Sequence, residues 1–138
     1  MVPEFGTMGL MEPIFTYESA ARLLPEARAR IGEVAERSAR LQGLALAIRA
    51  GEADEGDVPR AKALEAQLDE DLGWFRHQGI EVKGVAPALL DFPARAVVDG
   101  DEQVVLLCWR EGEDALAWYH PVETGYLGRA PIADLDDV

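Results

Sequence analysis

Four side chains in the C-terminal part of the chain could bind a ligand or take part in chemistry: those of Asp91, Trp109, His120 and Arg129. His120 is one of only two histidines, and an imidazole can act as a general base or a metal ligand near neutral pH. The guanidinium of Arg129 can bind a carboxylate or a phosphate through two parallel hydrogen bonds. We therefore take these four residues as the ligand-binding candidates.

Three carboxylates could complete a metal site around His120: those of Glu18, Asp91 and Glu123. One imidazole with several carboxylates suits a hard or borderline divalent metal ion, which is the only cofactor that the sequence suggests. The alternative is that His120 forms an ordinary hydrogen bond to a carboxylate at the edge of a sheet. The second histidine, His77, ends a predicted helix, where it complements the helix dipole.

Arg129 lies in an irregular segment bounded by glycines, residues 125–131. Glycine lets the backbone bend sharply and can bring an arginine over a neighbouring surface. Two roles are open for this side chain: it could bind an anion, or it could form a structural ion pair with Asp91 or Glu123.

No strong catalytic motif accompanies these residues, since the chain lacks GxSxG, a P-loop, HExxH and paired Cys-x-x-Cys. Trp109 is expected in the core rather than in a ligand platform. Cys108, in a dense apolar stretch, is expected to be an inert buried thiol. The sequence therefore specifies a candidate site but no reaction, and it leaves open whether the protein is an enzyme.

The composition is that of an acidic globular protein. The chain has 138 residues, 49% of them hydrophobic, and a net charge of -13. This charge argues against nucleic acid and anionic membrane surfaces as partners, because both attract clustered Lys and Arg. The single cysteine fits a reducing compartment, and the sequence shows neither a signal peptide nor an apolar membrane span. We expect a cytoplasmic protein.

The first ten residues look like cloning residues, since Glu4-Phe5 and Gly6-Thr7 are what common restriction sites encode. We leave residues 1–10 out of the fold prediction. Residues 11–138 are expected to form a single domain, with a helical hairpin at 16–79 and a β-meander and C-terminal segment at 80–132.

The helical hairpin is predicted from caps and from an apolar pattern. Thr16 can cap the first helix, and Gly79 can end the second. Pro25 either lies within a single helix that it kinks or begins a second helix. In the first helix small and apolar residues recur at alternating four- and three-residue spacing, as in a coiled-coil seam: Ala20, Leu24, Ala27, Ile31, Val34, Ser38, Leu41, Ala45 and Ile48.

The predicted strands are residues 80–82, 94–98, 103–110 and 115–120. Asp99-Gly100 is a strong signal for a tight hairpin turn, and residues 111–114 form the next turn. The stretch 83–90 is expected to be a polar connection. The fold class is therefore α+β: a long antiparallel helical hairpin packed on a three- to four-stranded antiparallel β-meander.

Both faces of this sheet are expected to be apolar. A tight turn at 111–114 would place on one face three pairs: Trp109 with Leu116, Leu107 with Trp118, and Val105 with His120. Leu106 and Cys108 lie on the other face. Two helices can cover one face only, so the other face indicates a homodimer, most simply a two-fold one. The alternative is that the helices bend around and cover both faces.

Several short segments resemble a bacterial family of proteins of unknown function, DUF2203. They are Phe15–Pro25, Asp91-Phe-Pro93, Leu107-Cys-Trp109, Tyr119-His120 and Gly125–Pro131. Trp118-Tyr119 stands where members usually have these aromatics in the other order, and Ser19 stands where an acid is common. The resemblance implies no assigned activity. It directs attention to Glu18, Asp91, Trp109, His120, Gly125 and Arg129.

Two functions follow as hypotheses. The first is a dimeric binding or scaffold module, with an interface made by the sheet and the helical seam. The second is a small metal- or anion-binding protein, for instance a hydrolase, with a site around His120, Asp91 and Arg129.

Overall fold

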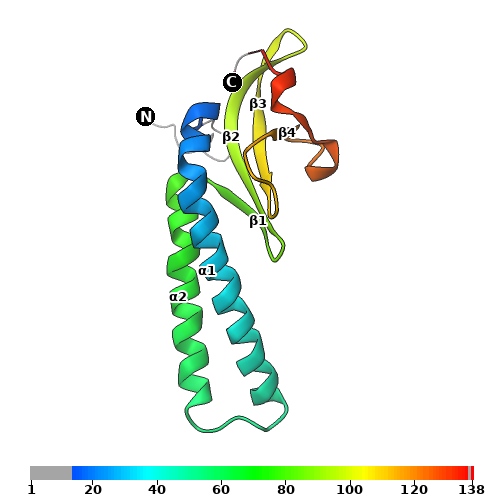
Figure 1. Ribbon diagram of the computed structural model, residues 1–138. Helices are drawn as coiled ribbons and strands as arrows, with labels where there is room; N and C mark the ends of the chain where they lie inside the picture. The colour runs from blue at the N-terminus through cyan, green and yellow to red at the C-terminus, as the bar shows by residue number, and fades with distance from the viewer. Residues whose placement is uncertain (1–13, 137) are drawn as a thin grey trace, which may run out of the picture.

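The computed structural model describes residues 14–136 and 138, so the predicted cloning residues lie outside the described part. Two helices, α1 (Tyr17–Arg49) and α2 (Asp57–Gln78), form a hairpin that packs against a five-stranded antiparallel sheet (Figure 1). The predicted α+β class is confirmed. The sheet has one strand more than the three or four expected.

Helix α1 begins at the predicted cap. The Thr16 hydroxyl accepts a hydrogen bond from the Ser19 amide at 3.0 Å, and the Ser19 hydroxyl accepts one from the Thr16 amide at 3.0 Å. This reciprocal capping box satisfies two amides that have no partner inside the helix. Pro25 lies within a single helix, so the alternative of a second helix starting there is wrong.

Helix α2 begins at Asp57, with Gly56 in the capping position. Gly79 ends it in the left-handed conformation, with φ of 87°, as predicted. Within the described residues, neither helix is long and apolar enough to cross a lipid bilayer.

The strands follow one another in the sheet in chain order, as a meander. They are β1 (Glu81–Val85), β2 (Ala88–Val98), β3 (Asp101–Arg110), β4 (Trp118–Pro121) and β5 (Ala130–Pro131). The prediction of a polar connection up to residue 90 is wrong, because β2 already begins at Ala88 and pairs with β3 from Leu89 to Val98. The two-residue strand β5 was not predicted.

The predicted register between β3 and β4 is wrong by one residue. Leu107 lies opposite Tyr119, not Trp118, and Leu106 lies opposite His120. The connection is not a tight turn at 111–114, because it runs from Glu111 to Ala117. Alternate residues of a strand point to opposite faces, so this shift moves His120 to the face opposite the one expected.

The helices cover one face of the sheet. Phe92, Leu107 and Tyr119 lie in the same buried cluster as Leu24 and Ile31 of α1. Phe75 of α2 joins this cluster with no exposed surface. The predicted hairpin turn at Asp99-Gly100 is confirmed, since it joins β2 to β3, and the resulting register places Phe92 opposite Leu107.

The middle of the second face is not the exposed apolar surface that we expected. Leu106 and Cys108 are at most 2% exposed within one chain. The segment after β4 lies across the sheet from the helices (Figure 1). Its Arg129 donates a hydrogen bond to the Cys108 carbonyl at 3.4 Å. The C-terminal segment, rather than bent helices, therefore contributes to covering this face.

Candidate functional site

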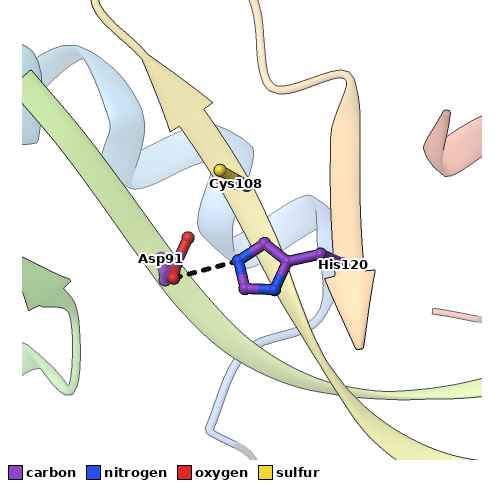
Figure 2. Close-up of side chains that lie close together, drawn as sticks. All are labelled: Asp91, Cys108 and His120. Carbon is purple, nitrogen blue, oxygen red and sulfur yellow. Dashed lines mark hydrogen bonds and ion pairs between the residues drawn. The ribbon is translucent and has the colours of Figure 1, made fainter. Parts of the chain in front are cut away.

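Three side chains from three adjacent strands meet on the face of the sheet away from the helices: those of Asp91 (β2), Cys108 (β3) and His120 (β4) (Figure 2). The His120 Nε2 lies 3.1 Å from the Asp91 Oδ2. One ligand atom from each residue can be chosen so that all three lie within 4.8 Å of one another.

The strand pairing explains why these side chains meet. Asp91 lies directly opposite Cys108, so both side chains point to the same face. His120 pairs with Leu106, two residues before Cys108, and therefore shares that face. Its ring reaches diagonally across β3 to Asp91, as Figure 2 shows.

The site is closed. Asp91, Cys108 and His120 are 1%, 0% and 2% exposed. Burial raises the pKa of Asp91, although His120, Cys108 and Lys83 act in the opposite direction. Burial, helped by the nearby Asp91 carboxylate, raises the pKa of Cys108 to about 12. A thiol in this state is a poor nucleophile, in agreement with the inert thiol expected from the sequence.

The polar atoms of this group are only partly satisfied. The second ring nitrogen of His120, Nδ1, lies 2.9 Å from the carbonyl oxygen of Pro121. The Asp91 Oδ1 is buried and has no hydrogen-bond partner among the described residues. Buried polar atoms of folded proteins nearly always have a partner, so this oxygen calls for an explanation.

Arg129 forms a structural clasp, and its partner is not one of the two predicted. Its Nη2 lies 2.8 Å and 2.7 Å from the two carboxylate oxygens of Glu113, in the β3–β4 loop. Its guanidinium also stacks on Trp118 and Tyr126, with 5.0 Å and 4.8 Å to the ring centroids. The pairing with Asp91 or Glu123 is therefore wrong, and the charge of Arg129 is already neutralised by Glu113.

Trp109 lies in the core, as expected, at 3% exposure. Its indole Nε1 donates a hydrogen bond of 2.9 Å to the Glu113 carbonyl, and the Arg28 guanidinium lies 5.3 Å from its ring centroid. This tryptophan anchors the β3–β4 loop to the sheet.

The other proposed metal ligands lie outside the buried group. Glu18 is exposed in the first turn of α1, where Arg22 approaches it at 3.6 Å. Glu123 is exposed after β4. His77, which was expected only to complement the dipole of its helix, is exposed near the end of α2. Among the described residues the possible metal ligands gather as Asp91 and His120 with Cys108, which the sequence had not suggested as a ligand.

His120 and Arg129 do not converge on an open pocket with a carboxylate, which is the arrangement that the predicted hydrolase site around His120, Asp91 and Arg129 required. A hollow of about 650 Å³ lies elsewhere, between the end of α2 and β1, and the candidate residues do not line it. Its walls are mostly apolar and include Leu72, Phe75, Val82 and Val85. The geometry therefore gives no support to a hydrolase.

Comparison with known proteins identifies a family but no activity. No curated protein and no solved structure matches the chain. The family described as "uncharacterized conserved protein (DUF2203)" matches residues 13–132, which is most of the chain. The match includes both helices, all five strands and the buried group. The chain therefore belongs to the DUF2203 family.

Proposed function

We propose that the protein is a homodimeric binding or scaffold module whose contact surface lies on the projecting hairpin, defined as residues 36–71. The buried group offers no open site to a substrate, so a partner would bind at the surface. Figure 1 shows that the hairpin continues well past the sheet before its helices are joined.

The main support is a mismatch between sequence pattern and burial. The apolar seam of α1 runs without a break to Ile48, but its buried members end at Val34. No residue from Ala35 to Trp74 is buried, and Leu41, Leu44, Leu64 and Leu68 are only half-buried. Helices gain most of their stability by packing an apolar face, so a seam left half-open suggests a partner.

The charges of the projecting hairpin favour a second copy as that partner. Residues 36–49 carry three Arg and one Glu, a net charge of +2. Residues 57–71 carry five acids with Arg60 and Lys62, a net charge of -3. A two-fold dimer repeats each contact twice, so α1 of one copy can face α2 of the other with opposite charge.

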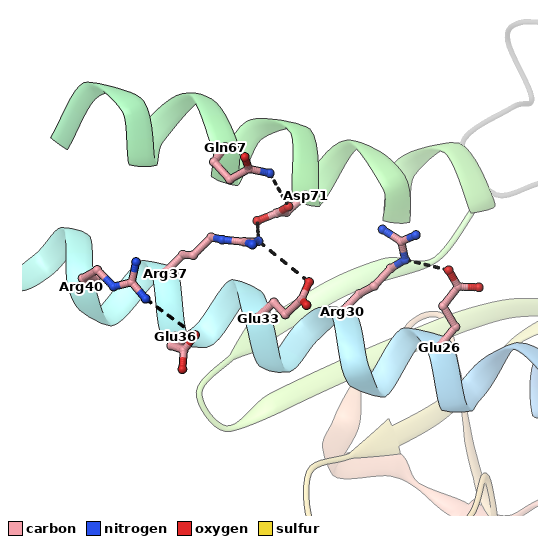
Figure 3. A network of polar contacts seen from close by, with 8 residues as sticks. All are labelled: Glu26, Arg30, Glu33, Glu36, Arg37, Arg40, Gln67 and Asp71. Carbon is pink, nitrogen blue, oxygen red and sulfur yellow. Dashed lines mark hydrogen bonds and ion pairs between the residues drawn. The ribbon is translucent and has the colours of Figure 1, made fainter. Parts of the chain in front are cut away.

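The hairpin presents this surface in a defined register. Arg37 of α1 binds Asp71 of α2 at 2.6 Å, and Gln67 donates to the same carboxylate at 3.1 Å (Figure 3). Among the described residues this is the only ion pair that joins the two helices. By contrast, Arg40 pairs within α1 at 3.8 Å, and its side chain is 61% exposed.

Light scattering coupled to size-exclusion chromatography tests the proposal. We expect twice the chain mass of 15.1 kDa at micromolar concentration, and a lower apparent mass for Leu44→Glu. Leu127→Glu is the control, because Leu127 is 96% exposed and lies far along the chain in the C-terminal segment. Circular dichroism shows whether both variants fold. A wild-type protein that stays monomeric contradicts the proposal, as does an equal loss of mass in both variants.

A further inference from the structure

We propose that Asp91, Cys108 and His120 form a closed binding site for one divalent transition metal ion of the zinc type. This site goes beyond the scaffold role of the hairpin, since it lies on the far face of the sheet and does not depend on a second copy.

The hydrogen bond made by Nδ1 of His120 determines whether Nε2, the other ring nitrogen, can bind a metal ion. The Pro121 carbonyl can only accept, so the His120 Nδ1, 2.9 Å away, carries the hydrogen and donates it. In the neutral ring, Nε2 then holds a lone pair. This is the usual arrangement of a metal-binding histidine, whose second nitrogen is oriented by a backbone carbonyl or a carboxylate.

The lone pair of His120 Nε2 points at a second acceptor, the Asp91 Oδ2, at 3.1 Å (Figure 2). Two acceptors this close repel each other unless a positive particle lies between them. A proton can fill this role, but it leaves the buried Asp91 Oδ1 with no neighbour to bind other than the weakly donating Cys108 thiol. A metal ion bound through both carboxylate oxygens would account for both observations.

The third residue selects the class of metal. A Cys108 thiolate with an imidazole and one carboxylate is a mixed set of soft and borderline ligands, which suits Zn²⁺ or Co²⁺ and disfavours Mg²⁺ and Ca²⁺. The charges also balance. One carboxylate and one thiolate neutralise a divalent ion, and a neutral centre costs least to bury.

The geometry requires only a small closing movement. Zinc lies about 2.0–2.3 Å from such ligands, so its ligand atoms lie about 3.5–4 Å apart in a tetrahedral site. The three ligand atoms here already lie within 4.8 Å of one another. A shift of about 1 Å brings them into range. On binding, the Cys108 proton and the proton shared by Asp91 and His120 leave to solvent as the metal bonds form.

Such a site would act on the fold rather than on a substrate. Asp91 and Cys108 belong to the long β2–β3 ladder of ten residue pairs, whereas His120 belongs to the short β3–β4 ladder of four. A metal ion would fasten β4 and the chain that follows it to the body of the sheet.

Cobalt titration of untagged, chelator-treated protein tests the site. We expect one Co²⁺ per chain, with the visible absorption of a tetrahedral ion and a thiolate-to-cobalt band in the near ultraviolet. Cys108→Ser should abolish the thiolate band and weaken binding at least about ten-fold. His77→Gln is the matched control, because His77 is the other histidine and is exposed, and it should bind as the wild type does.

Three outcomes would overturn the inference: no cobalt bound by the wild type, cobalt bound without a thiolate band, or equal loss of binding in His77→Gln. Circular dichroism of the metal-free variants separates loss of the site from loss of the fold. Asp91→Asn, which keeps the side chain's size, gives a second test if Cys108→Ser does not fold.

Discussion

Arg129 holds Glu113 through a single guanidinium nitrogen that lies 2.8 Å from one carboxylate oxygen and 2.7 Å from the other. The same carboxylate accepts a hydrogen bond of 2.8 Å from the Arg110 amide at the end of β3. The pair thus joins the C-terminal segment to the β3–β4 loop and to the sheet.

Removing one partner of this clasp should be costly. The Arg129 and Glu113 side chains are only 12% and 24% exposed, so Glu113→Ala leaves a largely buried charge without its partner. We expect the free energy of unfolding to fall by about 2–3 kcal/mol. Urea unfolding measures it. Glu102→Ala is the control, because Arg95 and Glu102 are more than half exposed, and it should cost no more than about 1 kcal/mol.

One substitution, glycine to alanine, should have opposite effects at two positions. Gly43 lies in the interior of α1 with open space around it, so Gly43→Ala should stabilise the protein by about 0.5–1 kcal/mol. Gly79 has φ of 87°, and an added methyl group would overlap the Ile14 side chain. Gly79→Ala should therefore destabilise by more than about 1 kcal/mol. Thermal unfolding measures the change in stability of both variants. A Gly79→Ala variant that is more stable than the wild type would contradict the structural role given to Gly79 at the end of α2.

The loop of the hairpin should make a small contribution to stability that depends on pH. The Gly56 amide donates to the Asp54 carboxylate at 2.9 Å, and this hydrogen bond, with Arg60 adding to it, lowers the pKa of Asp54 from 3.8. The folded state therefore favours the charged form. The hydrogen bond to the Asp54 carboxylate therefore stabilises the protein at pH values above the pKa that Asp54 has in the unfolded chain. This stabilisation is lost as pH falls through the pKa that Asp54 has in the folded protein.

Asp54→Asn tests this sign. The variant should be less stable than the wild type at neutral pH, and the difference should shrink at acidic pH, below the ordinary carboxyl pKa of 3.8. Urea unfolding at both pH values measures it, and NMR titration of the Asp54 carboxyl gives the pKa directly. A difference that grows as pH falls would reverse the assignment.

Local signals predicted the helices and the first β-hairpin well. Thr16 and Gly79 lie at helix ends because their side-chain or backbone chemistry suits those ends. Asp99-Gly100 permits a two-residue turn, and such a turn fixes the register of β2 on β3. Extended to residue 91, that register places Asp91 opposite Cys108, so the sequence held the signal for this pair. The pair was missed because the predicted strand, residues 94–98, began three residues after Asp91.

The remaining site residues could not be placed from local signals. The seven-residue connection from Glu111 to Ala117 is held by long-range bonds, such as the one from the Trp109 indole to the Glu113 carbonyl. The sequence of such a loop does not indicate the pairing register of the two strands that it joins. Strand β5 has only two residues, Ala130 and Pro131, which pair with Tyr119 and Trp118 of β4, so no periodic pattern could reveal it.

The pairing of β4 with β3 fixes which side chains of β4 enter the core. With residues 111–117 between the strands, Tyr119 points into the core and His120 points to Asp91. A slip of β4 by one residue against β3 would exchange them, putting an imidazole among apolar side chains and a phenol beside the carboxylate. A slip of two residues would keep each side chain on its face but would move His120 away from Asp91. The pairing register of β4, rather than the residue types of the loop, therefore keeps the imidazole within reach of the carboxylate.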